Sequence, residues 1–220
     1  MRLIIAAILA FVLLLSQSGS ADRAHPRLLD SVRPLSQVTL RDFTTNMITY
    51  RNICTVSSIN AALHLWLSAA HCVLDEDADN APRSGLMIFG HLVFIVKTDI
   101  TADLAILLTP DYAVHALRLA SNGPLWEDTI RVVGYSFGLP SITITPGTVS
   151  NPDGICLPGV ASSYMLFTAA VAAGQSGSPV VNSRGQIVSV VQIGCGQDYS
   201  PGGGAIYARL KAFAGEYFER

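Results

Sequence analysis

Residues 174–179 read Gly-Gln-Ser-Gly-Ser-Pro and place Ser176 between glycines, which permit a tight turn and close approach of a substrate. A serine hydroxyl is a weak nucleophile near neutral pH. Acyl transfer therefore needs an imidazole that takes its proton and a carboxylate that orients the imidazole. The N–H groups of Gly174 and Ser176 would form the oxyanion hole. The alternative is an ordinary turn, which is what most Gly/Ser/Pro clusters are.

Two earlier segments offer the imidazole and the carboxylate. His71 follows the small residues Ser-Ala-Ala at the end of an apolar run, and Cys72 comes directly after it. Asp103 starts the apolar run 103–108, where a carboxylate is partly desolvated unless it is hydrogen-bonded. The alternatives are a structural histidine and an aspartate that caps a turn. Together, the three segments predict a catalytic triad of His71, Asp103 and Ser176.

The order of these residues argues against two other hydrolase classes. An α/β-hydrolase needs its histidine after the nucleophile, and it carries a glycine where this chain has Ser178. A subtilisin-like order needs an aspartate before the histidine together with an α/β pattern, which is absent. All five histidines precede Ser176, and we interpret those other than His71 as structural: His25, His64, His91 and His115.

Short β-type runs separated by turn residues follow residue 53, with no alternating helices, which is typical of sandwiches and barrels. A link between two halves is expected in residues 119–128, and the spacing of apolar residues predicts a helix over 210–218. The runs are 62–67, 86–96, 104–108, 129–135, 141–145, 164–169, 186–193 and 205–209.

The three segments occur in the order of the motifs of the chymotrypsin-like (trypsin-like) serine peptidase family, which the chain resembles over residues 53–210. Further similar segments are 133–135, 145–150 and 205–210, the last resembling the family's final strand, and the serine motif looks like that of bacterial members. The resemblance implies an all-β fold of two antiparallel six-stranded barrels with a short C-terminal helix. His71 and Asp103 would come from the first barrel and Ser176 from the second.

The expected organisation has four parts. Residues 1–21 form a signal peptide, 22–50 an N-terminal arm or pro-segment, 51–120 the first barrel, and 121–220 the second barrel and the C-terminal helix. Residues 3–15 are apolar, which is shorter than the roughly 20 residues that span a bilayer. We therefore expect a secreted protein, extracellular or periplasmic, with no stable membrane anchor. An uncleaved anchor is the alternative.

Four cysteines in an exported chain favour two disulfides, for which three connectivities exist. No C-x-x-C spacing or clustered histidine indicates a metal site. In the family, the cysteine after the histidine pairs with one on the neighbouring strand. The resemblance thus implies Cys54–Cys72 and leaves Cys156–Cys195.

Fourteen basic and sixteen acidic residues, without a basic run, argue against nucleic-acid partners. The expected partners are protein or peptide substrates, no cofactor is predicted, and a monomer is expected. The predicted function is that of a secreted serine endopeptidase that forms an acyl-enzyme. A protease-like protein that kept the fold for binding is the alternative.

The resemblance also assigns a pocket for the residue before the cut bond. Its members carry no charge, so small to medium apolar residues should be preferred there. Two positions depart from the family: Gln175 stands where digestive and clotting members have an aspartate that receives a new N-terminus, and Gln192 replaces a serine that supports the triad aspartate. The assigned pocket residues are Ala170, Val171, Ile193, Gly194 and Ala205.

Overall fold

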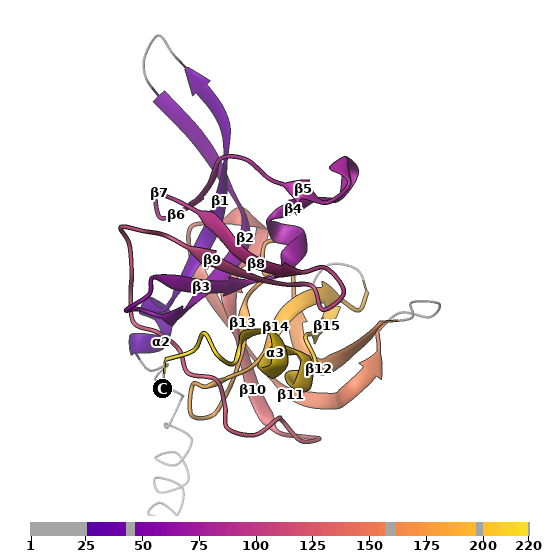
Figure 1. Cartoon of the computed structure of the whole chain (residues 1–220). Coiled ribbons are helices and arrows are strands. Elements are labelled where there is room, and N and C mark those ends of the chain that lie inside the picture. The colour runs from indigo at the N-terminus through magenta and orange to yellow at the C-terminus, as the bar shows by residue number, and fades with distance from the viewer. Residues whose placement is uncertain (1–25, 43–46, 157–161, 197–199, 220) are drawn as a thin grey trace, which may run out of the picture.

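The computed structural model describes residues 26–42, 47–156, 162–196 and 200–219. The predicted signal peptide lies outside the described residues. Figure 1 shows two β-structures, one from the first half of the chain and one from the second, with a long hairpin of β1 and β2 that projects from the first.

The first half forms an antiparallel sheet of seven described strands in the order β7-β6-β1-β2-β3-β9-β8. The edge strands β7 and β8 are separated only by Val93, so residues 91–99 pair first with β6 and then with β9 and link the two edges of the sheet. With β7 and β8 taken as one interrupted strand, the first half has the six antiparallel strands that were expected, and the predicted all-β fold is confirmed. The strands are β1 (Val32–Asp42), β2 (Met47–Asn60), β3 (Leu65–Ser68), β6 (Leu86–Ile88), β7 (His91–Leu92), β8 (Phe94–Asp99) and β9 (Leu104–Leu108).

The second half closes into the predicted six-stranded barrel, in the order β10-β11-β12-β15-β14-β13. Its interior is filled by large apolar side chains, among them the fully buried Ile130, Met165 and Phe167. The strands are β10 (Thr129–Tyr135), β11 (Ile142–Ile155), β12 (Ser163–Val171), β13 (Pro179–Asn182), β14 (Ile187–Gly194) and β15 (Ser200–Gly204).

The N-terminal arm expected for residues 22–50 is wrong for the part that the structure describes. Residues after the helix α2 (Pro26–Asp30) form β1, which pairs with β2 along its length and with β6 on its other side. Val32 and Leu35 are fully buried in β1. This strand belongs to the sheet because its apolar side chains complete the core of the first half.

The final strand is also displaced from the predicted position at 205–210. It is β15, and the helix α3 (Tyr207–Ala214) begins within the expected strand. This helix ends four residues before the predicted end at residue 218. Leu210 and Phe213 bury one face of α3. Remaining short elements are β4 (Leu74–Asp75), which pairs with β5 (Ala81–Pro82), and three 3₁₀ turns at Ala70–Cys72, Glu76–Ala78 and Ser136–Gly138.

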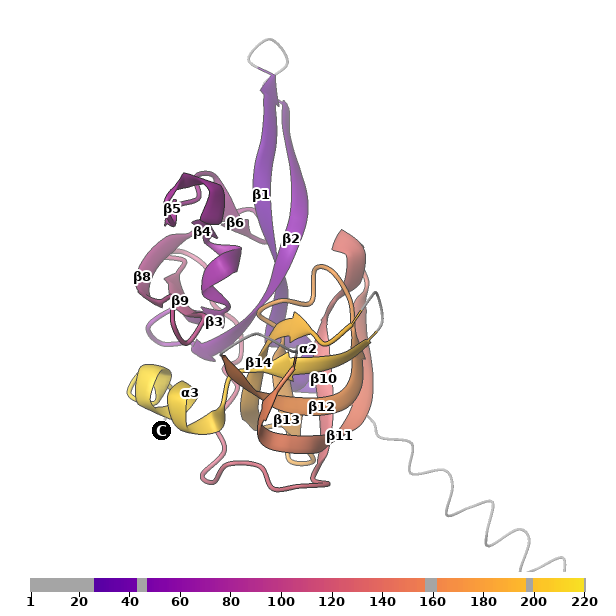
Figure 2. The ribbon, with the colours of Figure 1, turned by 90° about the vertical axis from the view of Figure 1, so that its right-hand side faces the viewer.

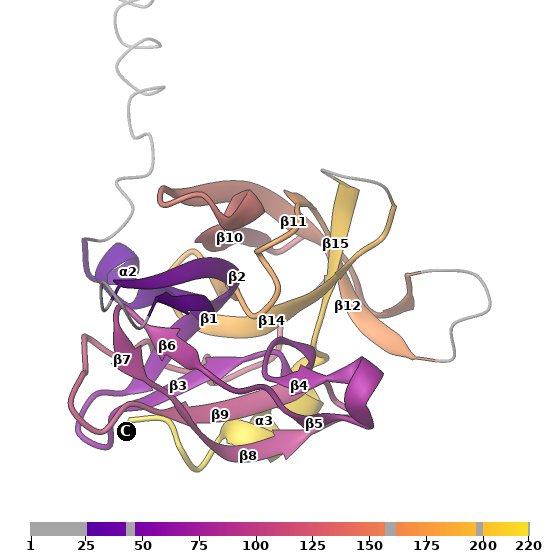
Figure 3. The same ribbon diagram turned by 90° about the horizontal axis from the view of Figure 1, so that it is seen from above.

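The chain crosses from the first half to the second near residues 117–120. The N–H of Leu117 donates to the Ser58 carbonyl of the first sheet, and the N–H of Ala120 donates to the Ile187 carbonyl of the barrel. One hydrophobic cluster draws residues from both halves and from α3, including Ile59, Val133 and Leu210. Figures 2 and 3 show α3 beside the first-half strands while β10 to β15 lie on the other side. The two halves are thus joined by packing as well as by the connection.

Candidate active site

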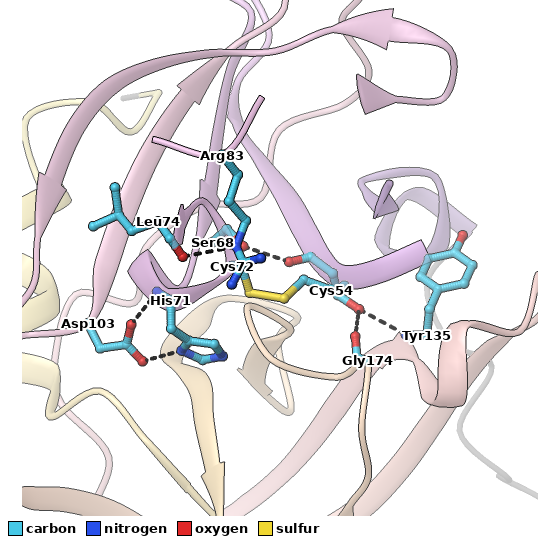
Figure 4. Close-up of a disulfide and its surroundings, with 10 residues drawn as sticks. Cys54, Ser68, His71, Cys72, Leu74, Arg83, Asp103, Tyr135 and Gly174 are labelled. Atoms are coloured by element: carbon cyan, nitrogen blue, oxygen red, sulfur yellow. Dashed lines mark hydrogen bonds and ion pairs between the residues drawn. A yellow bond between two sulfur atoms is a disulfide. The ribbon is translucent and has the colours of Figure 1, made fainter. Parts of the chain in front are cut away.

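His71 and Asp103 meet at the end of the first sheet (Figure 4). His71 lies in the 3₁₀ turn that follows β3, and Asp103 directly precedes β9, which pairs with β3. The Asp103 carboxylate accepts two hydrogen bonds from this one residue: Nδ1 of the ring at 2.8 Å and the backbone N–H at 2.9 Å. Since a carboxylate accepts, Nδ1 carries the proton, and Nε2 is the nitrogen that can act as a base.

Asp103 has a left-handed backbone, with φ of +48°, a conformation that Asp tolerates better than most residues. The side-chain amide of Gln192 in β14 donates to the carbonyl oxygens of both Ala102 and Asp103, the latter at 2.9 Å. Gln192 thus differs from the supporting serine of the family in its role. It holds the backbone of the turn from the second half and leaves both carboxylate oxygens to His71.

Ser176 lies in the loop between β12 and β13, and the glycines around it are required. Gly174 and Gly177 have φ of +88° and +81°. A Cβ on Gly174 would lie 2.7 Å from the Tyr135 carbonyl oxygen, and one on Gly177 would lie 2.2 Å from that of Thr55. Only glycine fits these positions, which agrees with a tight turn around the serine.

Thr55 of β2 holds this loop from the first half. Its N–H donates to the Ser176 carbonyl at 2.9 Å, and its hydroxyl donates to the Gly174 carbonyl at 3.0 Å while it accepts from the Tyr135 N–H at 3.0 Å. The carbonyl of Gly174 is therefore turned toward Thr55. The sequence analysis did not identify Thr55 as a functional residue. The one feature of the sequence that could have pointed to it is its position directly after Cys54.

Ser176, Gly174 and His71 line one cavity of about 870 Å³ between the two halves. Within the described part of the chain, neither the N–H of Gly174 nor that of Ser176 donates to a backbone carbonyl, whereas Gln175 and Gly177 do. Two N–H groups without a backbone partner, one on either side of Gln175 and close in sequence to a serine hydroxyl, can bind an oxyanion. The structure therefore brings together the hydroxyl, the imidazole and the two candidate donors.

Gln175, beside the serine, is 1% exposed, yet its amide is satisfied. Oε1 accepts from the Ala172 N–H at 2.9 Å, and Nε2 donates to the Thr143 hydroxyl at 3.0 Å. Thr143 in turn donates to the Gly134 carbonyl at 3.0 Å. The loop is thus ordered by neutral groups of the barrel, without a buried charge that would need a new N-terminus as partner.

The structure contains the two disulfides Cys54–Cys72 and Cys156–Cys195. The first joins β2 to the turn that carries His71. Among the described residues, the one group of three potential metal ligands is Cys54, His71 and Cys72, and its sulfur atoms are bonded to each other, so that neither is a thiolate.

The assigned pocket residues occupy β12, β14 and the residue after β15. Ile193 borders a cavity of about 390 Å³ that also includes His71 and Asp103. Val171 packs into the core of the barrel, and Ala205 packs into the cluster between the halves. Ala170 and Gly194 are partly exposed. Strand pairing places Ala170 opposite Pro201 and Gly194 opposite Gly202, on the same three adjacent strands.

Comparisons with known proteins agree with this geometry. A family model described as a trypsin-like peptidase domain matches residues 54–190. The Rv3671c protease from M. tuberculosis in its active form is similar in structure, with a TM-score of 0.63 and 19% identity over 86% of this chain and 81% of that chain. The HtrA-type protease AlgW with a decapeptide gives a TM-score of 0.67 and 18% identity over 85% of this chain and 64% of its own.

Sequence identities this low show a shared fold only. The family model gives more, because it covers most of the chain, including the segments that contain His71 and Ser176. Among the described residues, no helix is long and apolar enough to span a bilayer. The match to the family model shows that the chain belongs to the trypsin-like peptidase family and is a serine endopeptidase.

Proposed function

We propose that the chain hydrolyses peptide bonds through an acyl-enzyme on Ser176. In the first step, the Ser176 hydroxyl attacks the substrate carbonyl while Nε2 of His71 takes its proton. The oxyanion accepts hydrogen bonds from the N–H groups of Gly174 and Ser176. His71 then gives the proton to the leaving amine, and water releases the acyl group by the same route. Asp103 orients the ring and stabilises the imidazolium.

The observation that carries this proposal is the pair of hydrogen bonds from His71 to Asp103 beside the cavity that contains Ser176. A fluorophosphonate probe tests it, because the probe reacts only with an activated hydroxyl that faces an oxyanion hole. Mass spectrometry of the labelled protein should find the probe on Ser176. A folded protein without label would favour the alternative of a protease-like binding protein.

The proposed preference before the cut bond is for small to medium apolar residues such as Ala, Val or Leu. None of the five assigned pocket residues is charged, so a Lys, Arg or Glu side chain would be buried there without a partner. Each methylene should change discrimination by about 1–3 kcal/mol. A cleavage profile from a peptide library measures this preference, and dominant cutting after Arg, Lys or Glu would show that the pocket is misassigned.

The protein is proposed to act outside the cytoplasm, where its disulfides can form. Cys54 and Cys72 are 5% and 1% exposed, and they close a loop with a sequence separation of 18. Replacing both by Ser should lower the free energy of unfolding by roughly 3 kcal/mol and reduce peptide hydrolysis, because the turn with His71 loses its tie to β2. Urea unfolding and turnover check this.

The matched control is the double variant of Cys156 and Cys195, whose disulfide is not attached to the turn that carries His71. It should lose stability while it keeps most of its turnover per folded molecule. Equal losses of turnover in the two double variants would contradict a special role for Cys54–Cys72.

A further inference from the structure

Two cavities with volumes of about 870 and 480 Å³ lie side by side, and Ser176 borders the first of them. They share the wall residues Tyr50, Asn52 and Pro140, so a chain bound in the first can continue into the second. Arg51 and Arg83 border the first cavity, and Arg33 borders the second. No acidic residue lines either cavity in the part of the molecule that the structure describes.

The position of these cavities relative to the cut bond follows from His71, which borders two cavities. One includes Asp103, Gln192 and Ile193, and Ile193 is assigned to the wall of the pocket for the residue before the cut bond. The other includes Ser176 and the Cys54–Cys72 disulfide. Figure 4 shows Asp103 and the disulfide on different sides of the His71 ring, with Arg83 above the disulfide. The cavities with the arginines therefore receive the residues that follow the cut bond.

The arginines are poorly compensated within the protein. Arg33 donates to the Tyr112 hydroxyl at 3.0 Å and to the carbonyls of Leu29 and Val32, all of which are neutral. No ion pair joins Arg33 or Arg51 to a carboxylate of a described residue. Arg83 donates from Nε to the Leu74 carbonyl, and its Nη2 lies 3.9 Å from Oδ1 of the partly exposed Asp75. A chain with a net charge of −2 thus has a locally positive cleft.

The second cavity adds aromatic walls to this charge. Phe89 is 68% exposed, is held at a φ of +50°, and lies with its ring 5.7 Å from the Arg33 guanidinium. Tyr50 and Tyr135 also border the cavity. A guanidinium beside aromatic walls binds a carboxylate next to an apolar group, because the ion pair forms where water is partly excluded.

We propose that the enzyme selects peptide substrates with carboxylate side chains after the cut bond, bound by Arg51 and Arg83 close to it and by Arg33 farther along. This inference rests on the proposed function of Ser176 and deepens it by naming a substrate class. Guanidinium groups discriminate Asp and Glu from Asn and Gln, which have the same shape without the charge.

The test uses two sets of internally quenched peptides with Ala, Val or Leu before the cut bond. One set carries Asp and Glu in the positions after it, and the other carries Asn and Gln. The ratio of kcat/KM between the sets should favour the acidic peptides in low salt and should fall toward one at high salt. Replacing one arginine, in Arg51→Gln or Arg33→Gln, should reduce this ratio up to about fivefold.

Arg184→Gln is the matched control, since it removes the same charge from an exposed residue after β13 that borders neither cavity. An equal ratio for the two peptide sets in low salt would overturn the inference, as would an equal effect of Arg51→Gln and Arg184→Gln. Cleavage of both sets without preference leaves the proposed function intact.

Binding gives a second readout that does not depend on turnover. In the Ser176→Ala variant, fluorescence anisotropy should show tighter binding of the acidic peptides than of the amide peptides, and Arg51→Gln should weaken that difference. If no peptide is cut and Ser176 is not labelled, the proposed function fails, and this binding measurement still decides the inference. Equal binding of the two sets would overturn it.

Discussion

Ser176→Ala should reduce peptide hydrolysis by a factor on the order of 10⁶ in kcat and remove labelling by a fluorophosphonate, while the protein keeps its fold. The hydroxyl is the proposed nucleophile. The loop around it is ordered instead by the backbone bonds to Thr55 and by the two glycines with positive φ. Steady-state kinetics with an internally quenched peptide and thermal unfolding measure the two parts of this expectation.

Ser178→Ala is the matched control in the same loop. Its hydroxyl is buried and has no hydrogen-bond partner among the described residues, so its removal should leave turnover and labelling close to the wild-type values. Labelling that persists in Ser176→Ala and disappears in Ser178→Ala would show that Ser178, and not Ser176, is the nucleophile.

Asp103→Asn should lower kcat by a factor on the order of 10⁴, the size of the effect in the template triad. Both carboxylate oxygens accept from His71, one from the ring and one from the backbone. An amide offers one oxygen and an NH2 group that faces a donor, so the ring is held in the wrong tautomer. Turnover and the unfolding midpoint should be measured together, to separate chemistry from stability.

Asp99→Asn provides the comparison within the same turn, because Oδ1 of Asp99 accepts from the Ala102 N–H at 2.9 Å and an amide oxygen can do the same. It should keep activity within a few-fold of wild type. Near-normal turnover of Asp103→Asn would mean that another acid orients His71.

The candidate site was more predictable than the strands that carry it. Ser176, His71 and Asp103 stand in local motifs whose residue types follow from the chemistry of acyl transfer, so each is visible without the fold. Gln192 could also be singled out from the sequence, because an amide in place of a serine indicates a different pattern of hydrogen bonds around Asp103. Thr55 could not be found in this way, because its role depends on Gly174, which lies 119 residues later in the chain and which only the fold brings close.

β15 shows why strand positions were harder. It contains Gly202, Gly203 and Gly204, and glycine is a poor predictor of strands. In the barrel, a Cβ on Gly202 would lie 2.2 Å from the Phe167 ring, so the strand is glycine-rich because large neighbours fill its side-chain space. β1 is hard to predict for a related reason. Pro34 and the polar residues around it weaken the local signal for a strand, and β1 forms because it pairs with β2 on one side and with β6 on the other.

The cluster between the halves contains Leu28, which precedes β1, together with Phe213 and Phe218, which follow the last strand. Glu219 adds to this closure, since its N–H donates to the Ile59 carbonyl and its carboxylate accepts from the Ala61 N–H at 2.6 Å. Contacts between such distant residues carry a large loop-closure entropy and form late and slowly during folding. A chain that emerges N-terminus first cannot complete this cluster until β15, α3 and the residues after them have followed, so the two halves pack together last.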